Sequence, residues 1–330
     1  MKKNVIWVPV LAAIGVSAMI VGCGTPSVYK YPDPRRFGEV VGLKTPFDYT
    51  DECVILSNRF GKVVITRYAA QVVSYVPAGG QEVFFMPGDR DFSKNREMHG
   101  GIPICWPWFN MHGGPMSQQH GFARYSAWEV AEIHQDANLS RARFTLESNE
   151  ETQKLWPFDF RLTYTVTLSD RLAVSLLTEN TADPKTQAGK WFEFTEALHS
   201  YFLVGDVSRA VIRGLDGVRE DRMSSVAQGE VFKGDLKLAP GEGRVFFNNW
   251  PGDYLLFDEA NTRTLAISTR GNRDIVLWNC GPCRAKVGNL DVDDYRRFIC
   301  IEPATPDRAA SIKVLPGKRS ELMMTVKECR

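Results

Sequence analysis

The sequence has few histidines and almost no net charge. Five histidines occur in 330 residues, and 40 Lys and Arg residues balance 39 Asp and Glu residues to leave a formal net charge of +1. Nucleic-acid binding normally needs a field of positive charge, so we expect no nucleic-acid partner. The histidines form no HxH or HExxH pattern, and zinc sites usually show such short spacings. We therefore expect no metal and no other cofactor.

Long apolar runs are also absent, with one exception at the N-terminus. A basic start precedes an apolar run over residues 5–21, which ends in small residues just before Cys23. This order is typical of an export signal, and it resembles a bacterial lipoprotein signal, in which the cysteine is lipidated after cleavage. The resemblance predicts a signal peptide over 1–22, lipidation at Cys23 and a tether over 23–47. An uncleaved transmembrane anchor is the alternative, because the run approaches the ~20 residues needed to span a bilayer.

The remaining cysteines include one CxxC pair, Cys280 and Cys283. No second CxxC and no nearby histidine accompany it, which argues against a zinc ribbon. A redox-active CxxC normally opens a helix, whereas the surrounding residues are typical of strands and turns. We interpret the pair as two cysteines in a turn.

No long helical period occurs, and the pattern is almost entirely that of β-strands. Short segments rich in Val, Ile, Phe, Tyr and Thr are separated by Gly and Pro turns. The expected strands include 63–68, 71–76, 141–147, 161–168, 172–179 and 245–249. Within "FRLTYTVTL", alternation places Leu162, Tyr164, Val166 and Leu168 on one face. This pattern predicts an all-β antiparallel sandwich or barrel. No linker interrupts the chain after residue 50, so we expect one domain over 48–330.

The stretch 98–128 combines aromatic and planar polar side chains. A carbohydrate site needs such a mixture, because sugars present flat CH faces and hydroxyl edges. The candidates in this stretch are Trp106, Trp108, Phe109, Gln119, His120 and Arg124. Composition alone does not separate this interpretation from ordinary core packing. A metal site formed by His99, His112 and His120 has no positive support from their spacing.

Two further residues in apolar surroundings could perform acid–base chemistry. Glu302 lies in "FICIEPA", where burial should raise the pKa of its carboxyl and make it a suitable general base. His199 lies in an aromatic-rich segment and could act as the matching acid, because an unperturbed histidine titrates near neutral pH. Each also has a structural interpretation, as a hydrogen-bonded core histidine and as a solvent-facing glutamate at a strand end.

Five blocks in order, "GGIPICWPWF", "QQHGFARYSAWEV", "EALHSYFLVGDV", "IVLWN" and "FICIEPA", resemble the glucose-6-phosphate 1-epimerase branch of the aldose 1-epimerase family. The resemblance covers the chain after about residue 50. It implies a large antiparallel β-supersandwich, like that of galactose mutarotase, which interconverts the α and β anomers of a hexose or hexose 6-phosphate. It also implies that His199 protonates the ring oxygen and that Glu302 removes the proton of the anomeric hydroxyl.

The resemblance further implies substrate contacts at Gln119, His120, Arg124 and Asp253, with Trp278 as a pocket wall or a core residue. Where this branch has an arginine directly before "GGIP", the chain has His99, which we also expect to contact the substrate. Histidine is neither reliably charged nor bidentate, so this difference argues against a phosphorylated sugar.

These interpretations together predict an exported, membrane-anchored monomer that acts on a small sugar on the periplasmic or cell-surface side. A carbohydrate-binding lipoprotein of the same fold without catalytic activity is the alternative. A metal-dependent sugar hydrolase is a second alternative, and it would require bound zinc or calcium.

Overall fold

A computed structural model describes residues 53–90, 98–110, 118–222, 230–247, 252–282, 289–306 and 311–329. All of them belong to the unit Asp33–Arg330. The expected signal peptide, Cys23, the tether and His112 lie outside the described residues. Within the ranges above, no helix is long and apolar enough to cross a membrane.

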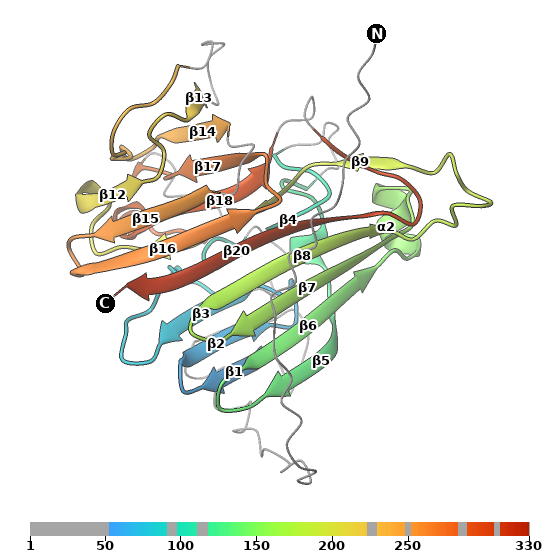
Figure 1. Ribbon diagram of the computed structural model, residues 1–330, viewed down its shortest axis with the longest axis horizontal. Helices are drawn as coiled ribbons and strands as arrows, with labels where there is room; N and C mark the ends of the chain where they lie inside the picture. The colour runs from blue at the N-terminus through green and yellow to red at the C-terminus, as the bar shows by residue number, and fades with distance from the viewer. Residues whose placement is uncertain are drawn as a thin grey trace. The chain divides into compact units, whose positions relative to one another are not determined.

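Strands dominate the structure, and they form two large and two small antiparallel sheets. The eight-stranded sheet has the order β12-β15-β16-β20-β8-β7-β6-β5 (Figure 1). Its strands are β5 (Glu129–Gln135), β6 (Ser140–Glu147), β7 (Phe160–Leu168), β8 (Leu172–Asn180), β12 (Ala210–Arg213), β15 (Gly252–Asp258), β16 (Arg263–Arg270) and β20 (Arg319–Cys329).

The second large sheet has seven strands in the order β13-β14-β17-β18-β10-β4, with β11 also paired to β18. These strands are β4 (Ile104–Cys105), β10 (Glu196–Leu198), β11 (Tyr201–Leu203), β13 (Arg219–Arg222), β14 (Gly243–Phe247), β17 (Asp274–Trp278) and β18 (Phe298–Thr305). The small sheets pair β1 (Cys53–Asn58), β2 (Gly61–Thr66) and β3 (Val72–Pro77), and separately β9 (Phe192–Phe194) with β19 (Ile312–Val314). The expected all-β antiparallel fold is confirmed.

Strand alternation determines which side chains enter the core. In β7, Leu162, Tyr164, Val166 and Leu168 are all fully buried, as the period of two predicts. They join a large apolar cluster that also contains residues of β17, β18 and β20. The main core therefore lies between the two large sheets and packs them against each other.

One short helix escaped the sequence pattern. Helix α2 (Glu150–Leu155) begins after Asn149, whose side chain accepts hydrogen bonds from the backbone N–H groups of Glu151 and Thr152. Thr152 completes a capping box by accepting from the N–H of Asn149. Six residues are too few to show a helical period, so only the cap could have indicated this helix.

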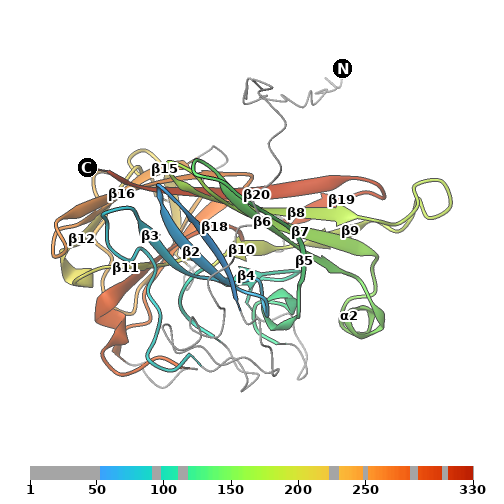
Figure 2. The same cartoon turned by 90° about the horizontal axis from the view of Figure 1, so that it is seen from below.

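Strand β18 is central to the seven-stranded sheet. It pairs with β17 on one side (Figure 1) and with β10 and β11 on the other. β10 pairs in turn with β4 (Figure 2). Ile299 and Ile301 join the main core, whereas Cys300 and Ala304 belong to separate clusters. One face of β18 is therefore used for core packing, and the other is available for a site.

Candidate active site

His199 and Glu302 face each other across the central ladder of the seven-stranded sheet. Ala197 pairs with Ala304, and Tyr201 pairs with Cys300. Counting along both strands from these pairs places His199, between β10 and β11, opposite Glu302 on β18. Facing residues of an antiparallel ladder project to the same side of the sheet. The backbone register therefore brings together two side chains that lie far apart in the sequence.

The two side chains meet in a buried position. His199 Nδ1 lies 3.2 Å from Glu302 Oε1, and the side chains are 7% and 1% exposed. The His199 N–H donates to the carbonyl of Pro103 at 3.0 Å, which ties this residue to the "GGIPIC" segment beside it. The backbone of three segments thus holds the histidine and the carboxyl group side by side, 3.2 Å apart.

Burial moves the proton affinities of the two groups in opposite directions. Desolvation raises the pKa of the Glu302 carboxyl well above its usual value, and Arg124 opposes this only in part. Desolvation, followed by the charges of His120, Arg124 and His99, lowers the pKa of His199 well below its usual value. The raised carboxyl pKa agrees with the sequence-based expectation. The expectation of an ordinary histidine pKa is wrong, because it ignored burial and the neighbouring cation.

Aromatic rings surround the pair. The His199 ring stacks on Tyr201, with centroids 4.8 Å apart and an interplanar angle of 6°. Trp278 contacts the His199 ring edge-on at 5.8 Å, and His120 does so at 5.4 Å. These rings restrict rotation of the imidazole, and of the three only Trp278 is partly exposed.

The loop that carries His120 depends on its glycine. His120 and Gly121 both have left-handed backbone conformations, with φ of 64° and 75°. A Cβ on Gly121 would overlap the carbonyl of Trp106, which accepts hydrogen bonds from the N–H groups of Phe122 and Ala123. The Asn110 N–H donates to His120 Nδ1 at 3.1 Å, so the neutral ring carries its proton on Nε2.

Arg124 supplies a buried positive charge to this site. It lies in the short 3-10 helix η2 (Ala123–Tyr125), is 4% exposed, and donates from a guanidinium nitrogen to the carbonyl of Met98 at 2.6 Å. Its charge lowers the pKa of Glu302, His199 and His120. A cation so close to the pair favours ligands that carry or develop negative charge on oxygen.

His99 occupies the same region and is fixed by Asn289. The Oδ1 atom of Asn289 lies 3.0 Å from both the His99 backbone nitrogen and its Nδ1. The Nδ2 of Asn289 donates to the carbonyl of Asp89 at 2.7 Å, which leaves Oδ1 as the acceptor for His99. The ring is 3% exposed and contacts Tyr201 edge-on at 6.0 Å.

The structure gathers five of the seven expected sugar-site residues, namely His99, His120, Arg124, His199 and Glu302. Gln119 is exposed and its amide lies 3.2 Å from His120 Nε2; because that nitrogen carries the ring proton, the amide oxygen of Gln119 is the group that can accept from it.

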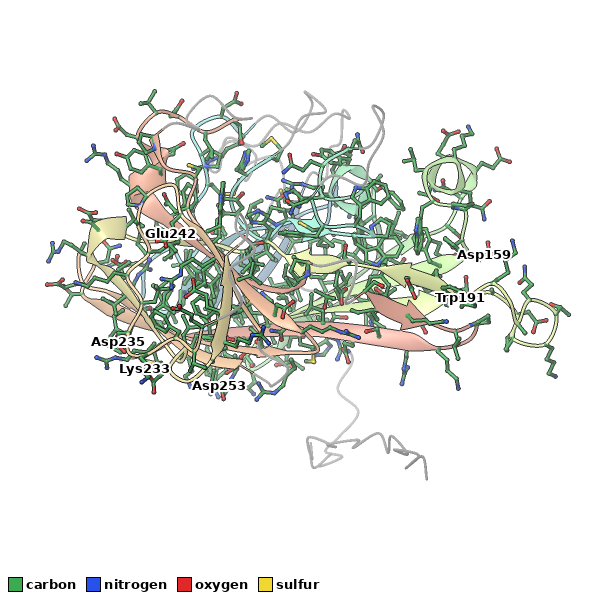
Figure 3. The ribbon with its side chains drawn as sticks, turned by 90° about the horizontal axis from the view of Figure 1, so that it is seen from above. Asp159, Trp191, Lys233, Asp235, Glu242 and Asp253 are labelled. Carbon is green, nitrogen blue, oxygen red and sulfur yellow. The ribbon has the colours of Figure 1, made fainter. Side chains whose placement is uncertain are left out.

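Asp253 is the exception. It lies on β15 of the other large sheet (Figure 3). Its side chain is 71% exposed, and its carboxylate is 3.7 Å from Arg270. Tyr254 and Leu256 point into the core, so alternation directs Asp253 outward and away from the buried cluster.

Three residues of the site were not singled out from the sequence. Tyr201 and Cys300 stand inside blocks that carried the resemblance, but no pattern indicated their positions beside His199 and Glu302. Asn289 has no sequence signal, because its role depends on contact with a residue 190 positions away.

Comparisons with known proteins agree with this geometry. A family model described as aldose 1-epimerase matches residues 52–327. The chain belongs to the aldose 1-epimerase family. This enzyme is therefore an isomerase of the mutarotase type, a class that interconverts the anomers of a sugar, and the galactose mutarotase-like supersandwich expected from the sequence is the fold observed.

Two relatives are each named "Putative glucose-6-phosphate 1-epimerase". The protein of Escherichia coli (strain K12) is 29% identical over 84% of this chain and 90% of its own length. The protein of Salmonella typhimurium (strain LT2) is 30% identical over 83% of this chain and 90% of its own length. A crystal structure described as a "putative mutarotase" from Salmonella typhimurium superposes with a TM-score of 0.77. The two proteins are 26% identical, and the match covers 89% of the present chain and 99% of the crystallised one.

Proposed function

We propose that this epimerase interconverts the α and β anomers of a hexose by proton transfer through His199 and Glu302. The single observation that carries the proposal is the buried approach of His199 Nδ1 to Glu302 Oε1 at 3.2 Å. The anomeric oxygen and the ring oxygen of an aldohexose are bonded to the same carbon, so an adjacent base and acid can reach both.

His199 and Glu302 must hold one exchangeable proton between them for this acid–base reaction. Burial favours a neutral carboxyl on Glu302 and a neutral ring on His199. With that proton on His199 instead of Glu302, the pair is an imidazolium and a carboxylate of the same total charge. Glu302 then accepts the proton of the anomeric hydroxyl while His199 donates to the ring oxygen. The ring opens to the aldehyde, rotation about C1–C2 presents the other face, and the reverse transfers close the other anomer.

The remaining buried polar residues suit the binding of a neutral sugar. His120, Arg124 and His99 surround the pair and supply hydrogen-bond donors, while Tyr201 and Trp278 supply apolar faces. Although the relatives are named for glucose 6-phosphate, we propose an unphosphorylated hexose. His99 lacks the permanent charge and the bidentate geometry with which arginine holds a phosphate.

The test follows anomer equilibration of fresh α-D-glucose, α-D-galactose and glucose 6-phosphate by polarimetry. Positioned acid–base groups contribute ~10²–10⁴-fold, so Glu302→Gln and His199→Ala should each lose well over tenfold. The control is His134→Ala, because His134 is exposed and ion-paired with Asp136. Wild-type rates in both site variants, or saturable sugar binding without any acceleration, would overturn the catalytic proposal in favour of a carbohydrate-binding protein.

A second test addresses the phosphate. His99→Arg should raise kcat/KM for glucose 6-phosphate relative to glucose by at least tenfold, because it adds a fixed cation. A wild-type protein that already prefers glucose 6-phosphate would overturn the assignment of a neutral hexose while leaving the acid–base pair in place.

We also propose that the protein is an exported lipoprotein anchored through Cys23. The N-terminal basic start, the apolar run over 5–21 and the small residues before Cys23 support this proposal. Mass spectrometry should find a mature chain that begins with a lipid-modified Cys23. An unmodified Cys23, or a retained 1–22 segment, would refute it.

A further inference from the structure

A third reactive side chain lies beside the acid–base pair, and the proposed reaction does not use it. Cys300 stands two residues before Glu302 on β18 and is fully buried. Alternation places both side chains on the same face of the strand. One ligand atom from each of His199, Cys300 and Glu302 can be chosen so that all three lie within 4.8 Å of one another.

Buried atoms of the same cluster have no hydrogen-bond partner in the described part of the chain. His199 Nδ1 and Glu302 Oε2 both lack a hydrogen-bond partner among the residues that the structure describes. Nδ1 lies 3.2 Å from Glu302 Oε1, but the angles at this contact are not those of a hydrogen bond. Buried polar atoms normally have partners, so such atoms indicate a missing ligand. Sugar hydroxyls can satisfy the nitrogen and the oxygen. They do not account for the thiol, which is a weak hydrogen-bonding group.

The donor set of one imidazole nitrogen, one sulfur and one carboxylate oxygen selects a particular class of cation. Mg²⁺ and Ca²⁺ prefer oxygen ligands, whereas Zn²⁺ and Cd²⁺ accept N, S and O together. Tetrahedral zinc bonds of ~2.0–2.3 Å place ligand atoms roughly 3.5 Å apart. The 3.2 Å between His199 Nδ1 and Glu302 Oε1 is close to this spacing, and the Cys300 sulfur lies within 4.8 Å of a ligand atom of each.

The charges around the cluster are mixed. Arg124 acts on both His199 and Glu302 and opposes a bound cation. A metal-bound Cys300 is a thiolate, so together with the carboxylate it supplies two negative charges against that one positive charge. Two more thiols, Cys105 and Cys280, are buried close enough to interact electrostatically with Cys300. The anionic ligands that form when a metal ion binds therefore outweigh the single charge of Arg124.

We infer that His199, Cys300 and Glu302 form a binding site for a divalent cation of the Zn²⁺ class, and that this ion inhibits anomer interconversion. The ion occupies the lone pairs of both His199 and Glu302, so neither can exchange a proton with a sugar. The inhibition rests on the proposed function, whereas the binding of the metal does not.

The experiment titrates the reduced, chelator-treated protein with Cd²⁺ and follows the sulfur-to-cadmium charge-transfer absorbance. Wild type should show saturable binding that Cys300→Ser abolishes and His199→Ala weakens at least tenfold. The matched control is Cys329→Ser, because Cys329 is an exposed thiol on β20 and should leave the titration unchanged. Cys300→Ala serves as a second variant in case the serine hydroxyl disturbs packing.

A parallel titration measures mutarotation in the presence of Zn²⁺, each variant being compared with itself without metal. Wild type and Cys329→Ser should be inhibited, and raising the sugar concentration should relieve the inhibition. An unchanged cadmium signal in both Cys300 variants would overturn the metal site, whatever the activity. A protein with the cadmium signal but no mutarotation would instead refute the proposed function and leave the metal site standing.

Discussion

Replacing Glu196 with glutamine should stabilise the protein, and increasingly so as the pH rises. Glu196 lies on β10 opposite Thr305, is 1% exposed, and neither of its carboxyl oxygens has a hydrogen-bond partner among the described residues. Desolvation raises the pKa of Glu196 from 4.5 to about 8. At about 1.4 kcal/mol per pH unit, that difference corresponds to about 5 kcal/mol of unfolding free energy.

The sign follows from the raised pKa. Below pH 4.5 the carboxyl is protonated in both the folded and the unfolded chain, so Glu196 has no pH-dependent effect. As the pH rises toward 8, the unfolded chain ionises freely while the folded chain does not, and stability is lost. Glutamine keeps the shape of the protonated acid and cannot ionise. The gain from Glu196→Gln should therefore be near zero at pH 4 and reach a few kcal/mol at pH 9.

Urea unfolding at pH 4, 5, 7 and 9, analysed by linear extrapolation, measures this difference directly. The control is Glu193→Gln, which removes the same charge from an exposed position on the adjoining strand β9. A difference between Glu196→Gln and wild type that stays constant within about 1 kcal/mol from pH 4 to pH 9 would refute the reasoning.

Three further predictions concern the site and its surroundings. The pH profile of kcat/KM should be bell-shaped, because the His199 and Glu302 pair needs one proton. The acid limb, which reports His199, should lie well below pH 6.5, and the alkaline limb, which reports Glu302, should lie well above pH 4.5. An acid limb at or above pH 6.5 would contradict this. Gly121→Ala should destabilise the protein by at least about 2 kcal/mol more than Gly217→Ala, because both glycines have positive φ but only Gly121 lies against another backbone; equal melting temperatures would contradict this. Asp253→Asn should leave mutarotation within twofold of wild type and change stability by less than about 0.5 kcal/mol, whereas a tenfold loss of activity would return Asp253 to the sugar site.

The strand pattern of this protein could be predicted because each short segment carries its own local signal. Alternation in β7 correctly assigned every core-facing residue from Leu162 to Leu168. The same rule, applied to Tyr254 and Leu256, would have directed Asp253 to the solvent side of β15. The role of Asp253 in sugar binding was implied by the resemblance alone, and its outward direction on β15 gives that role no support.

The candidate active site was harder to predict from local sequence signals. The apolar neighbours of Glu302 correctly predicted a raised carboxyl pKa, because burial depends on residues close in sequence. The facing positions of His199 and Glu302 depend on the register between β10, β11 and β18, which is a long-range property. The clamp of His99 by Asn289 is equally long-range, and no spacing rule connects those two residues.

Both faces of β18 are constrained by packing. Ile299 and Ile301 are in the main core, where a change of volume would disturb both large sheets. Cys300 and Ala304 lie on the opposite face with Glu302. Cys300 and Ala304 are themselves fully buried in smaller apolar clusters, so a substitution on that face must also preserve volume. The strand thus limits both of its faces to side chains of similar size, and any change beside Glu302 has to be judged by stability as well as by activity.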